Sequence, residues 1–158
     1  IAHLADSSLV ARRVGEVRRI VVASPAYLAR KGAPERPEDL ADHDVVLFVN
    51  QANTADWRFV DPAHGEQTVR VDARFQVNRA EAAIAAARDG YGVLAILSYQ
   101  VANDLAEGTL VRLLRPFERP AIPVQLVLPS TRLMPPRLRA FLDFAVPRLS
   151  ALDALKIS

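Results

Sequence analysis

Alternating apolar and polar positions predict short β-strands along most of the chain. Several runs of strand length are rich in β-branched residues and end at Gly, Pro or polar residues, as half-buried and fully buried strands do. The predicted strands are 8–17, 19–23, 45–49, 57–60, 68–77, 92–97, 109–114 and 124–128.

Segment 68–77 has the clearest period of two. Its odd-numbered positions from 69 are apolar and its even-numbered positions are polar or charged. This alternation is typical of a strand with one buried face and one solvated face. We expect this strand to form a hairpin with 57–60 through a turn at 61–65.

Helices are predicted between these strands by capping residues and by a longer apolar period. Ser24 and Pro25 are typical of an N-cap and a first helical position, and Gly32 ends the helix that they open. Asn78 and Ser98 are predicted to cap two further helices, and Asp89-Gly90 ends the first of these. The predicted helices are 26–31, 38–41, 79–88, 99–107 and 135–149.

The last predicted helix is amphipathic. Leu138, Phe141, Leu142 and Ala145 form its apolar stripe, and Pro147 is expected to kink or fray its end. Because helices and strands alternate along the chain, the fold class is predicted to be α/β with a mixed sheet.

The amino-acid composition limits the classes of protein to which the chain can belong. The 158 residues are 51% hydrophobic and 24% charged, so the chain can bury a core and is not disordered. No apolar run approaches the roughly 20 residues of a membrane-spanning helix. The charges nearly balance, with 20 basic and 18 acidic residues, and no basic stripe predicts direct binding of nucleic acid.

The chain contains no cysteine. This excludes thiol catalysis, disulfides and thiolate metal sites, and it is compatible with a reducing cytoplasm. The first residues contain no Met and no pattern of a signal peptide, so we expect the sequence to be a fragment of a longer protein.

Residues for catalysis are sparse. The three histidines, His3, His43 and His64, lie in segments typical of turns, and no G-x-S-x-G motif is present. His43 lies between two aspartates, but a solvated turn is favoured over a metal or catalytic site. The glycines at 90 and 92 end a helix and do not open one, so they do not match a dinucleotide-binding loop. We therefore predict no catalytic residue, no metal and no cofactor.

Three strand ends remain as candidate ligand contacts. Asn78 and Ser98 each follow a predicted strand and precede a helix, and Asn50 follows the buried strand 45–49. Helix N-termini attract anions, and the carboxyl ends of strands in open α/β sheets bind small ligands. For Asn78 and for Ser98, each taken alone, ordinary helix capping is favoured over ligand binding.

Several segments together resemble the effector-binding domain of LysR-type transcriptional regulators. They occur in the order and at the spacing of that family and extend over nearly the whole chain. The segments are 6–13 (DSSLVARR), 18–29 (RRIVVASPAYLA), 37–40 (PEDL) with His43-Asp44, Val77-Asn78, 90–93 (GYGV) with Leu97-Ser98, 123–129 (PVQLVLP) and 136–144 (PRLRAFLDF).

The resemblance implies a two-lobed domain of the periplasmic-binding-protein type with mixed sheets, whose first lobe is incomplete in this chain. Residues 1–18 and 123–158 correspond to lobe one, and 19–122 correspond to lobe two. It also implies an effector-binding role for Phe48, Val49, Asn50, Asn78, Leu97 and Ser98.

The partners implied by the resemblance are a small effector, a second copy of the chain and promoter DNA. The effector is expected to be a carboxylate or an aromatic acid, bound between the lobes. The protein is expected to be a cytoplasmic homodimer or homotetramer that reads DNA through an N-terminal winged helix-turn-helix absent from this sequence. The alternatives are a periplasmic-type solute-binding protein of transport and, less favoured because catalytic residues are sparse, an enzyme on the same fold.

Overall fold

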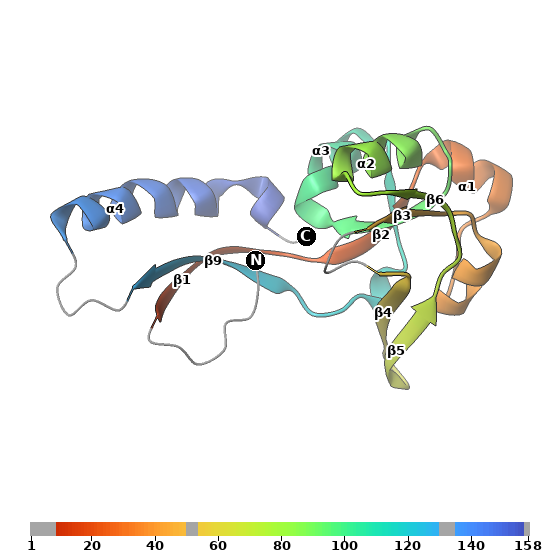
Figure 1. The fold of residues 1–158 in the computed structure, drawn as a ribbon, viewed down its shortest axis with the longest axis horizontal. Coiled ribbons are helices and arrows are strands. Elements are labelled where there is room, and N and C mark those ends of the chain that lie inside the picture. The colour runs from red at the N-terminus through yellow and green to blue at the C-terminus, as the bar shows by residue number, and fades with distance from the viewer. Residues whose placement is uncertain (1–8, 50–53, 130–134, 157–158) are drawn as a thin grey trace. The chain divides into compact units, whose positions relative to one another are not determined.

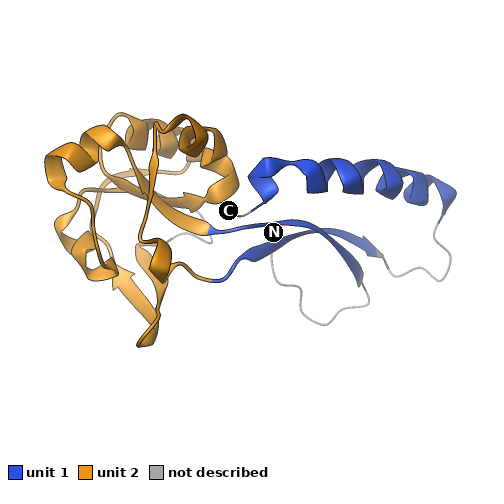
Figure 2. Cartoon of the chain, turned by 180° about the vertical axis from the view of Figure 1, so that it is seen from behind, with its two compact units in different colours: residues 1–18, 120–158 blue, residues 19–119 orange. Residues whose placement is uncertain are grey.

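The computed structural model describes residues 9–49, 54–129 and 135–156. The chain divides into two compact units, coloured separately in Figure 2: Ile1–Arg18 with Pro120–Ser158, and Arg19–Arg119. We call these unit 1 and unit 2. The assignment of residues 1–18, 19–122 and 123–158 to the lobes of a sensing domain stays a prediction.

Unit 1 is a two-stranded antiparallel ribbon with one long helix beside it (Figure 1). Strand β1 (Leu9–Val17) pairs with β9 (Ile122–Pro129), and the register shifts at a bulge between Arg13 and Gly15. Helix α4 (Pro136–Ala151) and the short 3-10 helix η4 (Asp153–Leu155) contact β1.

Helix α4 differs from its prediction in two respects. Leu142 and Ala145 are buried as expected, but Phe141 is 53% exposed, because it lies on the flank of the stripe that faces β1. Pro147 is expected to kink or fray the helix end, and the helix continues to Ala151, past the predicted end at 149. A proline near a helix end removes only one hydrogen bond, and one further turn still forms here.

The centre of unit 2 is a five-stranded sheet with the order β6-β3-β7-β2-β8. Its strands are β2 (Arg19–Ala23), β3 (Val45–Phe48), β6 (Ala73–Val77), β7 (Val93–Leu97) and β8 (Val111–Leu113). β3 runs parallel to β6 and β7, whereas β2 is antiparallel to β7 and β8. The prediction of an α/β fold with a mixed sheet is therefore confirmed.

Both faces of this sheet are covered (Figure 1). On one face, Ile20, Val22 and Leu94 pack against α2 (Ala80–Arg88) and the 3-10 helix η2 (Ser98–Val101), with α3 (Ala102–Glu107) at the margin. On the other face, Val21, Val45 and Ala95 pack under a second set of elements. These are α1 (Pro25–Lys31), the 3-10 helices η1 (Pro37–Asp42) and η3 (Arg115–Phe117), and β4 (Asp56–Asp61).

The predicted strand 68–77 is two strands in two sheets. β5 (Gly65–Arg70) forms a hairpin with β4, and β6 leaves that hairpin to pair with β3. The break comes at Val71, which is buried and donates its N–H to the Ala55 carbonyl. Phe75, predicted on the buried face, is 39% exposed at the edge of the sheet. Uninterrupted alternation concealed this change of partner, because a period of two is the same in both sheets.

The predicted helix caps are partly confirmed. Ser24 Oγ accepts the N–H of Tyr27, and the chain leaves α2 through Gly90 at a φ of 79°, a left-handed conformation that glycine adopts readily. Asn78 and Ser98, in contrast, are not caps. Arg79 occupies the N-cap position of α2 without a side-chain hydrogen bond, and Ser98 is the first residue of η2, which precedes the shorter α3.

Candidate functional site

The carboxyl ends of three neighbouring parallel strands meet at one edge of the unit 2 sheet. β6, β3 and β7 lie side by side in that order (Figure 1). The N–H of Val49 donates to the Val77 carbonyl (N···O 2.8 Å), which continues the pairing of Phe48 with Val77 beyond the strand end. We call this the carboxyl edge. Such an edge is where small ligands bind in open α/β sheets.

The structure brings five of the six predicted ligand contacts to the carboxyl edge. Phe48 and Val49 end β3, Asn78 follows β6, and Leu97 and Ser98 lie where β7 enters η2. Val49 and Asn78 are exposed, and the other three side chains are half-buried. Asn50 lies outside the described residues. A ligand-binding role for these residues stays a prediction.

Sequence reasoning missed Arg19, which belongs to the same region. β2 is antiparallel to β7, and this pairing sets Arg19 opposite Leu97. Arg19 also has the same parity as Val21 and Ala23, which belong to the core under β4. Alternate residues of a strand share a face. The alternation in 19–23 was therefore the sequence signal that could have placed Arg19 on the same face as Val21 and Ala23.

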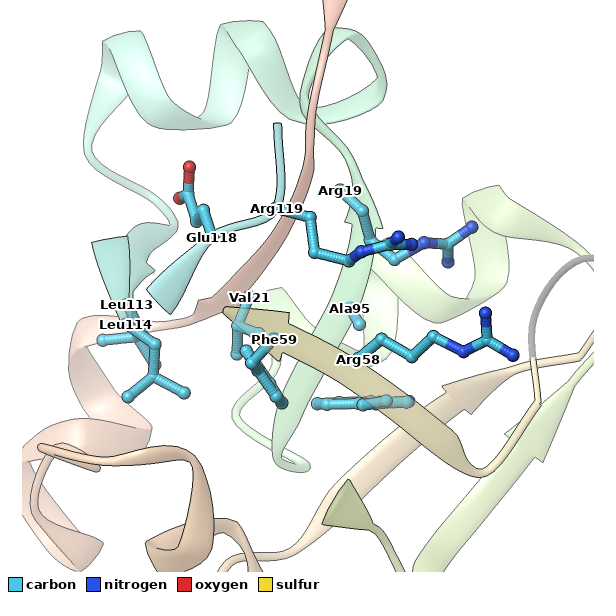
Figure 3. A pocket seen from close by; sticks show the side chains of 10 residues that line it. Arg19, Val21, Arg58, Phe59, Ala95, Leu113, Leu114, Glu118 and Arg119 are labelled. Atoms are coloured by element: carbon cyan, nitrogen blue, oxygen red, sulfur yellow. The ribbon is translucent and has the colours of Figure 1, made fainter. Parts of the chain in front are cut away.

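A pocket opens beside Arg19 between β4 and the sheet (Figure 3). Its cavity volume is only about 20 Å³. Val21, Phe59, Leu113 and other apolar side chains form its walls. Figure 3 shows Arg19, Arg58 and Arg119 extending to one side of the pocket, with the Glu118 carboxylate on the other.

Three arginines and one carboxylate line this pocket, and Arg119 pairs with Glu66 at an N···O distance of 3.3 Å. Glu118 accepts two hydrogen bonds of 2.6 Å from Arg112, so its charge is already neutralised. Partial burial and the nearby Arg119 lower the pKa of Arg19 from its ordinary value. Both effects disfavour a cation at this position.

The described residues contain no cluster of side chains able to hold a metal ion. His43 is half-buried, and its Nδ1 lies 3.0 Å from the hydroxyl of Tyr27. That hydroxyl also accepts the N–H of Asp44. His64 lies in the exposed turn of the β4–β5 hairpin beside Asp61. Both histidines therefore have structural partners close by.

Comparison with known proteins identifies the family to which this chain belongs. The model of the LysR substrate binding domain matches residues 1–150. The chain belongs to this family. Among LysR-type relatives, the regulator CrgA of Neisseria meningitidis serogroup B is 34% identical over 148 residues, covering 93% of this chain and 49% of CrgA. PtxR of Pseudomonas aeruginosa is 33% identical over 138 residues, covering 87% of this chain and 44% of PtxR. The chain spans about half the length of these relatives.

Solved structures place the fold among LysR-type regulatory domains, which have the periplasmic-binding-protein architecture. The regulatory domain of AphB from Vibrio vulnificus, treated with cumene hydroperoxide, aligns with a TM-score of 0.80 at 27% identity, covering 92% of this chain and 72% of that one. The regulatory domain of CrgA from Neisseria meningitidis aligns at 0.73 and 31% identity, covering 94% and 72%. The predicted family and fold are confirmed, and the transport alternative is not favoured. The helices that the structure describes include none long and apolar enough to cross a membrane.

Proposed function

We propose that this LysR-family domain binds a small carboxylate or aromatic acid through Phe48, Val49, Asn50, Asn78, Leu97 and Ser98. The family match over residues 1–150 supports a sensing role, and the convergence of Phe48, Asn78 and Ser98 at one edge of the sheet carries the choice of site. Backbone N–H groups at the starts of α2 and η2 suit an anionic ligand, and Phe48 and Leu97 suit its apolar part.

The proposal includes the partners of a transcriptional regulator. The relatives CrgA and PtxR are named as helix-turn-helix transcriptional regulators. We infer a cytoplasmic homodimer or homotetramer that contacts promoter DNA through a further winged helix-turn-helix domain. The effector binds one arrangement of the oligomer more tightly than the other. The difference between these two affinities sets how far the effector can shift the equilibrium between the arrangements. No residue has a catalytic role in this scheme.

Calorimetric titration of the full-length protein with 4-hydroxybenzoate, pyruvate and succinate tests the site. Asn78→Ala and Ser98→Ala are each expected to lower the affinity for whichever of these ligands binds by about tenfold. This is the effect of one lost polar contact. Asn103→Ala is the matched control, because Asn103 is an exposed asparagine on α3 and is not one of the proposed ligand contacts. Equal losses in Asn78→Ala and Asn103→Ala would contradict the assignment of the site.

A footprint on promoter DNA tests the coupling. The same ligand should change the length or the position of the protected segment in the unmodified protein, and Asn78→Ala should require a correspondingly higher ligand concentration. A footprint that stays unchanged at saturating ligand would argue against a sensing role.

A further inference from the structure

The register of the central sheet aligns Arg19 with two residues of the carboxyl edge. Arg19 of β2 pairs directly with Leu97 of β7. β7 in turn runs parallel to β3, where Val45 pairs with Val93. Counting four residues on from this pair sets Val49, just after β3, beside Leu97. Arg19, Leu97 and Val49 therefore lie at one level across three neighbouring strands.

The alignment continues to Asn78. β3 is also parallel to β6, where Phe48 pairs with Val77, and the N–H of Val49 donates to the Val77 carbonyl at 2.8 Å. The next residues of the two segments, Val49 and Asn78, therefore lie side by side. Because β6, β3, β7 and β2 are consecutive in the sheet, Asn78 and Arg19 are the two ends of one row. We call Arg19, Leu97, Val49 and Asn78 the edge row.

Alternation along the strands places the edge row on the face of the sheet that lies under β4. Alternate residues of a strand share a face, and each of Val21, Ala95 and Leu47 is two positions from a member of the row. All three belong to the core on that face. Gln76, two positions before Asn78, pairs with Leu47. The edge row thus has a guanidinium at one end, an amide at the other and apolar side chains between them.

Arg19 has no counter-ion in the described part of the chain. Its side chain is half-buried, and within residues 9–49, 54–129 and 135–156 no carboxylate forms an ion pair with it. Figure 3 shows Arg19 extending to the side away from the Glu118 carboxylate, which pairs with Arg112. A carboxylate from a ligand would offset the desolvation of the Arg19 charge through charged hydrogen bonds.

Taking the carboxyl edge as the ligand site, which rests on the proposed function, we propose that Arg19 binds the carboxylate of the effector and that Asn78 binds a second polar group at its other end. The apolar body of the ligand lies over Leu97 and Val49. The Cα atoms at the two ends of the row are about 14 Å apart, which is three strand spacings. Because the Arg19 and Asn78 side chains occupy part of this span, it suits one ring with two opposite polar substituents.

Three ligands of nearly the same shape separate the two ends of the row. 4-Hydroxybenzoate has both polar groups, 4-hydroxybenzamide lacks the charge, and benzoate lacks the hydroxyl. In calorimetric titration of the full-length protein, 4-hydroxybenzoate is expected to bind about tenfold more tightly than either of the other two. If 4-hydroxybenzoate does not bind at millimolar concentration, or binds no better than 4-hydroxybenzamide, the proposal is wrong.

Two variants assign each polar group of the ligand to one residue. Arg19→Gln should abolish the preference for 4-hydroxybenzoate over 4-hydroxybenzamide and keep the preference over benzoate, whereas Asn78→Ala should do the reverse. Arg79→Gln is the matched control, because Arg79 is an exposed arginine next to Asn78 and is not a member of the edge row. It should keep both preferences. Loss of both preferences in either variant of the row, or loss of the preference for the acid in Arg79→Gln, overturns the proposal.

The outcomes separate a wrong role for Arg19 from a wrong site. If Asn78→Ala weakens 4-hydroxybenzoate while Arg19→Gln keeps the preference for the acid over its amide, the carboxyl edge stands and the role of Arg19 is wrong. If neither substitution changes the affinity, both assignments are wrong. Should Arg19→Gln not fold, Arg19→Met replaces it, since methionine is unbranched, adaptable and uncharged. This variant should lose the same preference, and a preference that it keeps overturns the proposal.

Discussion

At the residue scale, Gly92 shows how one missing side chain lets two segments meet. A Cβ at this position would lie 2.2 Å from the carbonyl oxygen of Asp44, which accepts the N–H of Val93. Gly92→Ala must therefore displace backbone at the start of β7, and we expect it to lower the free energy of unfolding by about 1–3 kcal/mol.

Gly108 provides the control for Gly92. It has a positive φ of 72°, but a Cβ there meets nothing within 4 Å. Gly108→Ala should cost only the local conformational strain, about 1 kcal/mol. Urea unfolding of both variants tests whether Gly92→Ala loses more free energy of unfolding than Gly108→Ala. A smaller loss for Gly92→Ala would show that the close approach of Asp44 does not require glycine at position 92.

The Asp104–Arg88 pair gives a second prediction at this scale. Asp104 is 3% exposed and accepts hydrogen bonds from Arg88 of α2 and from Thr109. The hydrogen bonds from Arg88 lower the pKa of Asp104 most, and that from Thr109 lowers it further. We expect Asp104→Asn to lower the free energy of unfolding by about 1–2 kcal/mol. This lies toward the lower end for a hydrogen bond to a charged group, because water screens the half-exposed Arg88.

The pH dependence of this contribution follows from its sign. A carboxyl whose pKa is lowered on folding stabilises the protein above its unfolded pKa, which is about 3.9 for Asp. That stability is lost as the pH falls through the folded pKa. The stability difference between the wild type and Asp104→Asn should therefore be largest near neutral pH and shrink below about pH 4. Asp72→Asn, an exposed control, should change stability by less than about 0.5 kcal/mol at any pH.

At the element scale, Asp61 holds the β4–β5 hairpin. It ends β4, its side chain is 4% exposed, and Oδ1 accepts the N–H groups of Ala63 and His64 in the turn. Oδ2 accepts from Arg36 at the start of η1. The hairpin also supplies Trp57 and Phe59 to the core, so its position affects the pocket beneath it.

Substitution of Asp61 should loosen the hairpin and leave the central sheet in place. Asp61→Ala removes every acceptor, whereas Asp61→Asn keeps one oxygen for the turn. Hydrogen exchange of the β4 and β5 amides should therefore quicken more in the alanine variant than in the asparagine variant. Exchange in β3 and β7 should change little. Equal loosening by the two substitutions would show that the negative charge matters and the acceptor geometry does not.

At the scale of the whole molecule, the two units differ in how much core they build. Unit 2 packs both faces of a five-stranded sheet. Unit 1 has a two-stranded ribbon and leaves Val10, Val127, Phe141 and Phe144 between 43% and 59% exposed. Because small two-stranded assemblies are marginally stable, we expect residues 1–18 and 123–158 to exchange amide hydrogens faster than unit 2. Equal protection throughout the chain would contradict this difference.

The sequence by itself determined much of the fold and part of the site. Local signals at Ser24 and Gly90 marked helix ends correctly, and apolar runs located the strands of the central sheet. The order of short segments indicated the LysR family. Asn78 and Ser98 were selected as caps, which they are not, yet they lie at the carboxyl edge because each follows a parallel strand. The positions of these strand–helix junctions were predicted correctly although their capping was not, because the end of the preceding strand determines where each junction lies.

Only the tertiary structure decided which strands pair and which side chains converge. The change of partner at Val71 left no mark on the alternation of 68–77, because hydrogen bonding to β4 or to β3 requires the same local period. The pocket of Trp57, Arg19 and Arg119 joins residues from separate parts of the chain. Such groupings depend on non-local register and on burial, and these arise only when distant segments pack together.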